Sequence, residues 1–301
     1  MEKTNYKGWE NCYKLSNGKV DLIVTTDVGP RIIYFGLTKG ENVFKNYEDM
    51  MGLTGGNEWR IYGGHRLWCA PEENPRSYAP DNESIQIKDF GDFVRLSQPT
   101  EVLTGIEKQI DIYLDKKAAE VKVVHRLINR NIWAIELAVW ALSVMAPGGK
   151  AIIPFSQRGS HASGDLLPSD SITLWSYTSM ADPRWTWGSK YIMLQSQPGN
   201  QVAQKVGAMV SAGWAAYALN DHLFVKHFDY TPEFAYADYG CNVESFTNEA
   251  MLELETLGPL TWLKPGESAE HVETWNLYKN VPMPATEADV DQYILPLVNE
   301  E

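Results

Sequence analysis

Two glutamates near the C-terminus, Glu253 and Glu255, have a spacing that could place proton-transfer chemistry on a β-sheet. They alternate with Leu252 and Leu254, and successive side chains of an extended strand point to opposite faces, so both carboxylates share one face. Such a pair is typical of a polar cleft, and it is equally typical of a solvated outer sheet face. The alternation alone leaves both interpretations open.

A second strand is predicted directly after this pair. Pro265-Gly266 is a turn signal, and beyond it His271, Glu273 and Trp275 again fall on one face of an extended chain. Acids, a histidine and an indole on neighbouring strands would together form a polar cleft on a large sheet.

Two long segments, residues 46–81 and 156–189, lack strand alternation and are predicted to be site loops. Long irregular segments in a compact domain are usually functional or disordered, and the many Trp and Tyr residues here argue against disorder. The candidate site residues in these segments are His65, Arg66, Trp68, Arg158, His161, Asp182, Arg184, Trp185 and Trp187.

The aromatic residues of the second segment suggest a sugar site. Trp185 and Trp187 can offer stacking platforms for the apolar faces of a pyranose, while Asp182 and Arg184 bond its hydroxyls. The alternative is an aromatic plug that covers the end of a β-sandwich.

Arginines and histidines give two further candidate roles. Arg31, Arg66 and Arg158 could clamp a carboxylate or phosphate, because a guanidinium presents a planar fork of donors, or they could neutralise neighbouring acids. His65 and His161 are candidates for ligand contact or proton transfer, and the alternative for His65 is a loop-bracing hydrogen bond.

Segments with period-2 alternation recur along the chain and predict an all-β fold. They cover residues 20–26, 31–37, 84–89, 93–98, 106–114, 120–129, 137–145, 191–195, 205–211, 214–219 and 223–228. So many strands imply two large packed antiparallel sheets. With no break in composition, we expect a single domain over residues 1–301, ending in a short helix that Thr286 caps and Pro296 stops.

The composition limits the partners. The chain has 301 residues, and 39 acidic against 26 basic residues give a formal charge of −13, which disfavours nucleic acid and anionic membranes. The N-terminus lacks an apolar signal region, so we expect a cytoplasmic protein, although a processed exported protein would look the same. No Cys/His metal spacing, phosphate loop or dinucleotide fingerprint occurs, so no tightly bound cofactor is expected. Whether scattered Glu, Asp and His residues hold a divalent ion stays open. The oligomeric state stays open.

Several motifs together resemble the galactose mutarotase-like superfamily. They are Gly29-Pro30-Arg31-Ile32, the Gly-Gly-His-Arg-Leu-Trp element at 63–68, and the Glu-Leu-Glu-Thr-Leu-Gly-Pro-Leu element at 253–260 with its Pro-Gly-Glu turn and Glu273-Thr274-Trp275. The resemblance covers nearly the whole chain and is greatest to an uncharacterised bacterial branch of the DUF4380 type. It implies a β-supersandwich whose concave face binds sugars.

The resemblance also implies site residues. The general base of aldose 1-epimerases would fall at Glu255, or at Glu253 in a shifted register. The acid histidine of a His-x-Tyr-Phe element is missing, because the corresponding stretch reads Val139-Trp140-Ala141-Leu142. His65 could replace it, as could His161 or His125, although His125 shares a strand face with apolar residues and is predicted to be a core histidine.

The expected function is therefore binding of a small sugar or oligosaccharide, with epimerase-type general acid/base chemistry as the leading enzymatic interpretation. A sugar-binding module without turnover is the competing class. A lyase or glycoside hydrolase is a weaker alternative, because Glu253 and Glu255 project in parallel and a hydrolase would need an opposing carboxyl such as Asp182, Asp238 or Glu244.

Overall fold

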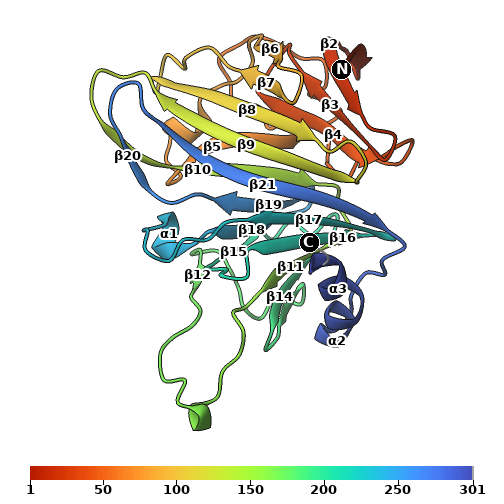
Figure 1. The fold of residues 1–301 in the computed structure, drawn as a ribbon, viewed down its shortest axis with the longest axis vertical. Helices are drawn as coiled ribbons and strands as arrows, with labels where there is room; N and C mark the ends of the chain where they lie inside the picture. The colour runs from red at the N-terminus through yellow and green to blue at the C-terminus, as the bar shows by residue number, and fades with distance from the viewer. Residues whose placement is uncertain (300–301) are drawn as a thin grey trace.

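The computed structural model describes residues 1–299 and consists of two large antiparallel sheets that face each other (Figure 1). Over these residues the first, sheet A, has 11 strands, and the second, sheet B, has 10. Sheet A runs in the order β1 (Glu2–Tyr6), β2 (Trp9–Ser16), β3 (Val20–Thr25), β4 (Arg31–Leu37), β5 (Gly64–Ala70), β10 (Ile135–Met145), β19 (Leu252–Leu257), β18 (Val243–Thr247), β15 (Gln204–Ala208) and β12 (Ile172–Leu174), with β20 (Thr261–Leu263) paired to β10. Sheet B runs in the order β13 (Trp185–Trp187), β14 (Tyr191–Gln195), β11 (Lys150–Pro154), β16 (Trp214–Leu219), β17 (His222–Phe228), β21 (Ser268–Lys279), β9 (Glu120–Asn129), β8 (Ile106–Leu114), β7 (Val94–Ser97) and β6 (Gln86–Asp89). The predicted all-β class is confirmed.

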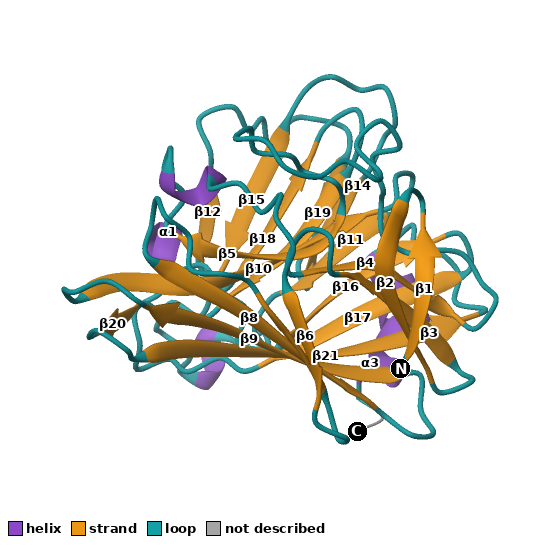
Figure 2. Ribbon diagram, turned by 90° about the horizontal axis from the view of Figure 1, so that it is seen from above, coloured by secondary structure: helices purple, strands orange, loops and turns teal. Residues whose placement is uncertain are grey.

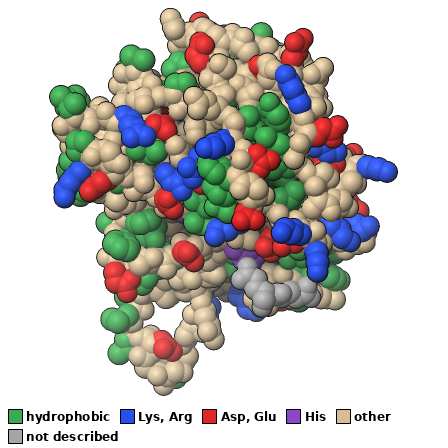
Figure 3. Space-filling view, turned by 45° about the horizontal axis from the view of Figure 1, so that its top comes forward, with side chains coloured by type: hydrophobic (Ala, Val, Ile, Leu, Met, Phe, Trp, Pro, Cys, Tyr) green, Lys and Arg blue, Asp and Glu red, His purple; other side chains and the backbone are tan. Residues whose placement is uncertain are grey.

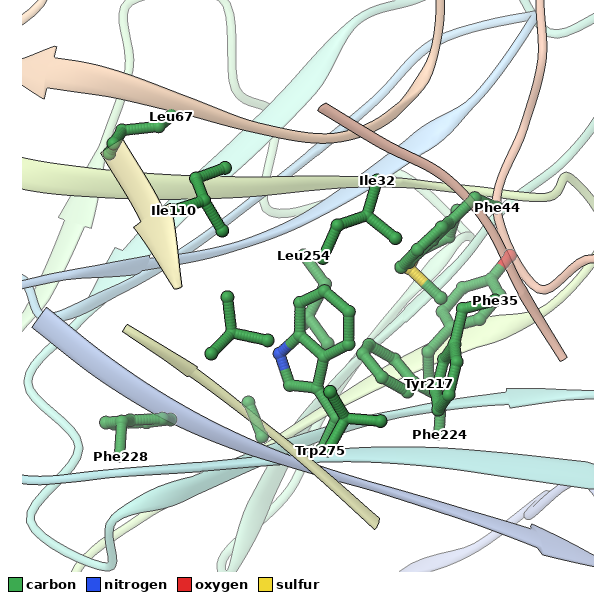
Figure 4. Packing of buried hydrophobic residues seen from close by; sticks show 14 of the residues in the cluster. Ile32, Phe35, Phe44, Leu67, Ile110, Tyr217, Phe224, Phe228, Leu254 and Trp275 are labelled. Carbon is green, nitrogen blue, oxygen red and sulfur yellow. The ribbon is translucent and has the colours of Figure 1, made fainter. Parts of the chain in front are cut away.

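The core lies between the sheets and is built from the inward residues of alternating strands. Trp275 of β21 contacts Phe35, Phe44 and Phe224 edge-on or at a tilt, with ring centroids 5.6–5.7 Å apart, and Leu254 of β19 lies beside them (Figure 4). Each fully buried large side chain of this kind stabilises the fold by roughly 2–3 kcal/mol.

The helical elements are short and lie outside the two sheets, as Figure 2 shows. α1 (Ala237–Gly240), η1 (Arg76–Tyr78) and η2 (His161–Ser163) are single turns, and η2 lies on a long loop that projects from the body (Figure 1). No helix within residues 1–299 has the length and apolarity needed to cross a bilayer. On the face drawn in Figure 3, acidic and basic side chains are interspersed.

The C-terminal helix covers the outer face of sheet B, where Val290, Ile294 and Val298 pack on its strands. It comprises α2 (Glu287–Asp289), η3 (Val290–Ile294) and α3 (Leu295–Val298). The Thr286 cap is confirmed, because its side chain accepts from the Asp289 amide in a capping box. Pro296 does not stop the helix, since it occupies the first turn of α3, where its missing N–H is not required.

Three expectations from the sequence need correction. Residues 64–70 form a central strand, β5, rather than a loop; Gly63 and Gly64 enter it with positive φ, and a side chain at Gly63 would meet the Lys45 carbonyl at 2.0 Å. Residues 156–189 likewise contain β12 and β13. β19 and β21 are not neighbours in one sheet, because they lie in opposite sheets and face each other.

Candidate functional site

A cleft with a volume of about 580 Å³ lies on the face of sheet A that points away from sheet B. Cross-strand register builds its floor: Arg66 of β5 is opposite Leu142 of β10, Leu142 is opposite Glu255 of β19, and Glu255 is opposite Glu244 of β18. Glu253 lies two residues along β19 on the same face, so the predicted pairing of the two carboxylates on one face is what the structure has.

The walls of the cleft are aromatic, and its floor is charged. The aromatic residues come from the loops around sheet A and from β5, β10 and β18: Tyr47, Trp59, Trp68, Tyr78, Trp140, Trp175, Tyr177 and Phe246. The charged residues that line it are Arg66, Glu72, Lys205, Glu253 and Glu255. Flat apolar walls above hydrogen-bonding groups suit the alternation of C–H faces and hydroxyl edges in a sugar ring.

Arg66 is fixed at one end of the floor. Its Nη2 lies 2.8 Å from Glu253 Oε1, and its guanidinium carbon lies 4.6 Å from the ring centroid of Trp68 and 5.7 Å from that of Trp59. Arg66 Nε and Nη1 have no hydrogen-bond partner among residues 1–299. The pair is therefore electrically neutral but retains donors that a ligand oxygen could use.

Lys205 of β15 occupies the other end. Its Nζ lies 2.7 Å from Glu244 Oε2 and 3.5 Å from Glu255 Oε2, and within 5 Å of the ring centroids of Trp140 (4.8 Å) and Trp175 (4.5 Å). Burial disfavours the ammonium, but the two glutamates outweigh it and raise the pKa of Lys205 above its ordinary value. Lys205 is therefore charged at any physiological pH.

Glu255 has the most perturbed environment of the glutamates that line the cleft. The Trp140 indole donates to its Oε2 at 2.9 Å, while its Oε1 is buried without a hydrogen-bond partner in the part of the chain that the structure describes. Burial, opposed by Lys205 and aided by Glu253, raises the pKa of Glu255 to about 7. Burial likewise raises the pKa of Glu244 well above its ordinary value. Near neutral pH the Glu255 carboxyl can therefore both accept and donate a proton.

His65 does not reach this cleft. It follows Gly64 on β5 and points to the opposite face from Arg66, into the space between the sheets, where it is fully buried. Its Nδ1 lies 2.9 Å from Ser143 Oγ and its Nε2 lies 2.6 Å from His125 Nε2. Burial lowers the pKa of His65 well below its ordinary value, so it stays neutral. His125, predicted to be a core histidine, is fully buried beside it.

The same interior holds an ion pair of sheet B that is hydrogen-bonded to β19 of sheet A. Lys226 of β17 lies 2.8 Å from Glu273 of β21 and donates to the Leu254 carbonyl of β19 at 3.1 Å. Thr256 of β19 donates to Glu273 and lies 2.7 Å from His271 Nε2. Ligand atoms of His65, His125 and Glu273 come within 4.8 Å of one another, the kind of group that can hold a metal ion. Lys226 also supplies positive charge at Glu273.

The remaining predicted residues lie outside the cleft. Arg31 is buried against Asp81 at 2.6 Å, and Arg184 forms a two-bond pair with Asp182. Trp185 and Trp187 stack on each other at 4.8 Å and pack on the core between the sheets, which agrees with the aromatic-plug alternative. Arg158 lies at the base of the projecting loop, and His161 is exposed on that loop.

The structure thus brings together Glu253, Glu255, Arg66 and Trp68 of the predicted set. It adds Lys205, Trp140 and the loop aromatics, which the sequence analysis did not select, and Glu244, named there only as a hydrolase partner. A charged residue inside an otherwise uncharged strand was the signal that could have identified Lys205 of β15 and Glu244 of β18.

Comparison with known proteins agrees with this architecture. No protein-family model and no curated protein sequence matches the chain. Among solved structures, a putative aldose 1-epimerase from Escherichia coli K12 is similar, with a TM-score of 0.56 and 12% identity over 89% of this chain and 99% of that chain. A galactose mutarotase-like protein from Lactobacillus casei has a TM-score of 0.54 and 10% identity over 89% of this chain and 100% of that one.

A further similar structure is a TPR-domain containing protein from Parabacteroides distasonis, with a TM-score of 0.58 and 14% identity, where the match covers 92% of this chain and 49% of that chain. At these identities the similarity shows a mutarotase-like fold and leaves function to the site itself.

Proposed function

We propose that this protein binds a sugar in the cleft of sheet A and that Glu255 transfers protons in an epimerase-type reaction at the anomeric carbon. One observation carries the proposal: a buried glutamate with an unpartnered oxygen forms the floor of an aromatic cleft. Burial, which raises the pKa of this glutamate to about 7, supports a role in proton transfer. The mutarotase-like fold of the similar structures supports it. Membership of the DUF4380-type branch is part of the same proposal.

The chemistry requires two proton movements. A base removes the proton of the anomeric hydroxyl while an acid protonates the ring oxygen, the ring opens to the aldehyde, and closure from the other face gives the second anomer. Glu255 suits the first role because its carboxylate is formed at neutral pH and its conjugate acid can return the proton. Lys205, 3.5 Å away, supplies positive charge beside the reacting oxygens.

The test is the rate of anomer interconversion. Saturation-transfer NMR or polarimetry on a panel of neutral, amino, acidic and phosphorylated sugars should show acceleration by the wild-type protein and its loss in Glu255→Gln. Absence of acceleration with every sugar, together with measurable binding, would contradict the catalytic part of the proposal.

A sugar-binding protein without turnover is the second candidate. The observation that favours it is that no histidine lines the cleft among the described residues, whereas the resemblance implies a histidine as the acid. Binding of a sugar that quenches or shifts Trp fluorescence, without any change in anomer exchange rate, would support this candidate over the first.

A further inference from the structure

The charge balance of the cleft carries information about its ligand. Glu72, Glu253 and Glu255 line it and Glu244 lies behind Lys205, so four carboxyl groups face only two cations, Arg66 and Lys205. Resting on the proposed function, we propose that the cleft prefers an amino sugar, a pyranose that carries a protonated amine, over a neutral sugar, and rejects phosphorylated and carboxylated sugars.

Both cations of the cleft already form ion pairs with glutamates. Arg66 is paired with Glu253 at 2.8 Å, and Lys205 is paired with Glu244 at 2.7 Å and with Glu255 at 3.5 Å. A phosphate or carboxylate would have to break one of these pairs and would then leave a buried glutamate without its partner. Leaving a buried carboxylate unpaired is strongly unfavourable, so anionic ligands are disfavoured.

The unpartnered polar atoms favour a ligand rich in donors. Glu255 Oε1, on the floor of the cleft, accepts no hydrogen bond within residues 1–299. An ammonium or a hydroxyl can donate to such an atom, whereas a phosphate dianion cannot. Arg66 Nε and Nη1 need an acceptor, and a sugar hydroxyl can accept from them while it donates to a glutamate.

The aromatic walls suit the same ligand. The ring faces of Trp59 and Trp68 already attract the Arg66 guanidinium, and those of Trp140 and Trp175 attract the Lys205 ammonium. An ammonium on a sugar ring is stabilised by the negative face of an indole in the same way, while the C–H face of the ring stacks on it.

Proton release gives this proposal a distinctive signature. The titratable and charged groups around Glu255 come from six places: Lys205 from β15, Glu244 from β18, Glu253 along its own strand, Arg66 from β5 with Glu72 from the loop after it, Tyr177 from the loop after β12, and Lys226 of β17 from the core side. An ammonium that enters beside these groups lowers the pKa of Glu255, which is protonated for the larger part of the time just below neutral pH. Binding should then expel a fraction of a proton into solution.

Isothermal titration calorimetry near pH 6.5, where an amine with a pKa of about 8 is charged, tests the proposal. The probes are glucosamine and galactosamine, their parent hexoses, their N-acetyl forms as uncharged controls, and glucose 6-phosphate with glucuronate as anions. We expect the amino sugars to bind about tenfold more tightly than the parent hexoses, equivalent to about 1.4 kcal/mol, and their heats to differ between two buffers of different ionisation enthalpy.

Two variants sharpen the test. Glu72→Gln removes an exposed carboxylate at the cleft and should lower the ratio of amino-sugar to neutral-sugar affinity severalfold, while the exposed and distant Glu10→Gln should leave this ratio unchanged. Equal or tighter binding of the neutral or N-acetyl sugars, or of the anions, would overturn the charge preference and leave sugar binding intact. Failure of every probe to bind would overturn the proposed function as well.

Discussion

Glu255 shows how a single residue acquires its chemistry from its neighbours. Its strand places it opposite Leu142 and Glu244, its Oε2 accepts from Trp140, and Lys205 stands at 3.5 Å. Burial favours the neutral acid and the ammonium favours the carboxylate, and the balance raises its pKa to about 7. The same side chain on an exposed strand would be a solvated carboxylate that does not exchange protons near neutral pH.

Glu255→Gln should reduce any acceleration of anomer exchange by roughly 10²-fold or more, because the amide keeps the shape but accepts no proton. Sugar affinity should change much less. NMR exchange and calorimetry on the same preparations measure both quantities, with Glu10→Gln as the control. An unchanged exchange rate in Glu255→Gln would show that another residue is the general base.

The same substitution should change how stability depends on pH. The pKa of Glu255 is raised from 4.5 to about 7 on folding, so the native state holds a proton that the unfolded state has lost between these values. Stability from this group is therefore complete below about pH 4.5 and is lost as the pH rises through 7. A glutamine at position 255 does not titrate, so it makes no pH-dependent contribution to stability.

We expect the free energy of unfolding of Glu255→Gln, relative to wild type, to increase by on the order of 2–3 kcal/mol between pH 4.5 and pH 8. Urea unfolding at the two pH values measures this difference, and Glu10→Gln should show none. A constant difference would mean that Glu255 titrates normally in the folded protein.

At the scale of elements, β5 divides its side chains between two environments. Arg66 and Trp68 face the cleft, whereas His65 faces the core and bonds Ser143 and His125. His65→Ala should therefore destabilise the protein by about 2–4 kcal/mol through the cavity and the lost hydrogen bonds. The exchange rate per folded molecule should stay within a few-fold of wild type, which NMR on samples of known folded fraction can measure. A large loss of the anomer exchange rate with little loss of folding stability would indicate that His65 takes part in catalysis.

Two tryptophans of similar burial test which element carries the stacking surface. Trp59 lines the cleft, whereas Trp187 of β13 stacks on Trp185 and packs on the core. Trp59→Ala should weaken sugar binding about tenfold, while Trp187→Ala should leave affinity unchanged and lower the melting temperature. Fluorescence titration and thermal unfolding of both variants give these values. The reverse pattern would favour the β13 loop as the ligand contact.

Alternation within one strand was visible from the sequence, and pairing between strands was not. The side-by-side placement of Glu253 and Glu255 follows from a period of two, and the capping role of Thr286 follows from local chemistry. Lys205 reaches Glu255 only because β15, β18 and β19 are consecutive in sheet A, and no local pattern encodes that order. β5 was predicted to be a loop because Gly63 and Gly64 lie at its start, and two consecutive glycines are typical of a turn.

For the whole molecule, the two sheets determine which residues can meet. Sheet A carries the cleft on its outer face, and the buried histidines His65, His125 and His271 lie between the two sheets. Sheet B closes the core and carries the C-terminal helix. The same architecture persists in similar structures at 10–14% identity, which shows that very different sequences can satisfy its layer pattern. Function must therefore be tested at the cleft.

β19 contributes side chains to two separate regions of the molecule, the core and the ligand cleft. Leu254 and Thr256 face inward to Trp275, Lys226 and the network of sheet B, and Glu253 and Glu255 face the ligand cleft. A saturation scan of this strand should consequently show two interleaved profiles, one of lost expression and stability at 254 and 256, and one of altered ligand preference at 253 and 255. Because the two faces of the strand are separate, substitutions at 253 and 255 can change the chemistry of the cleft without disturbing the packing of the core.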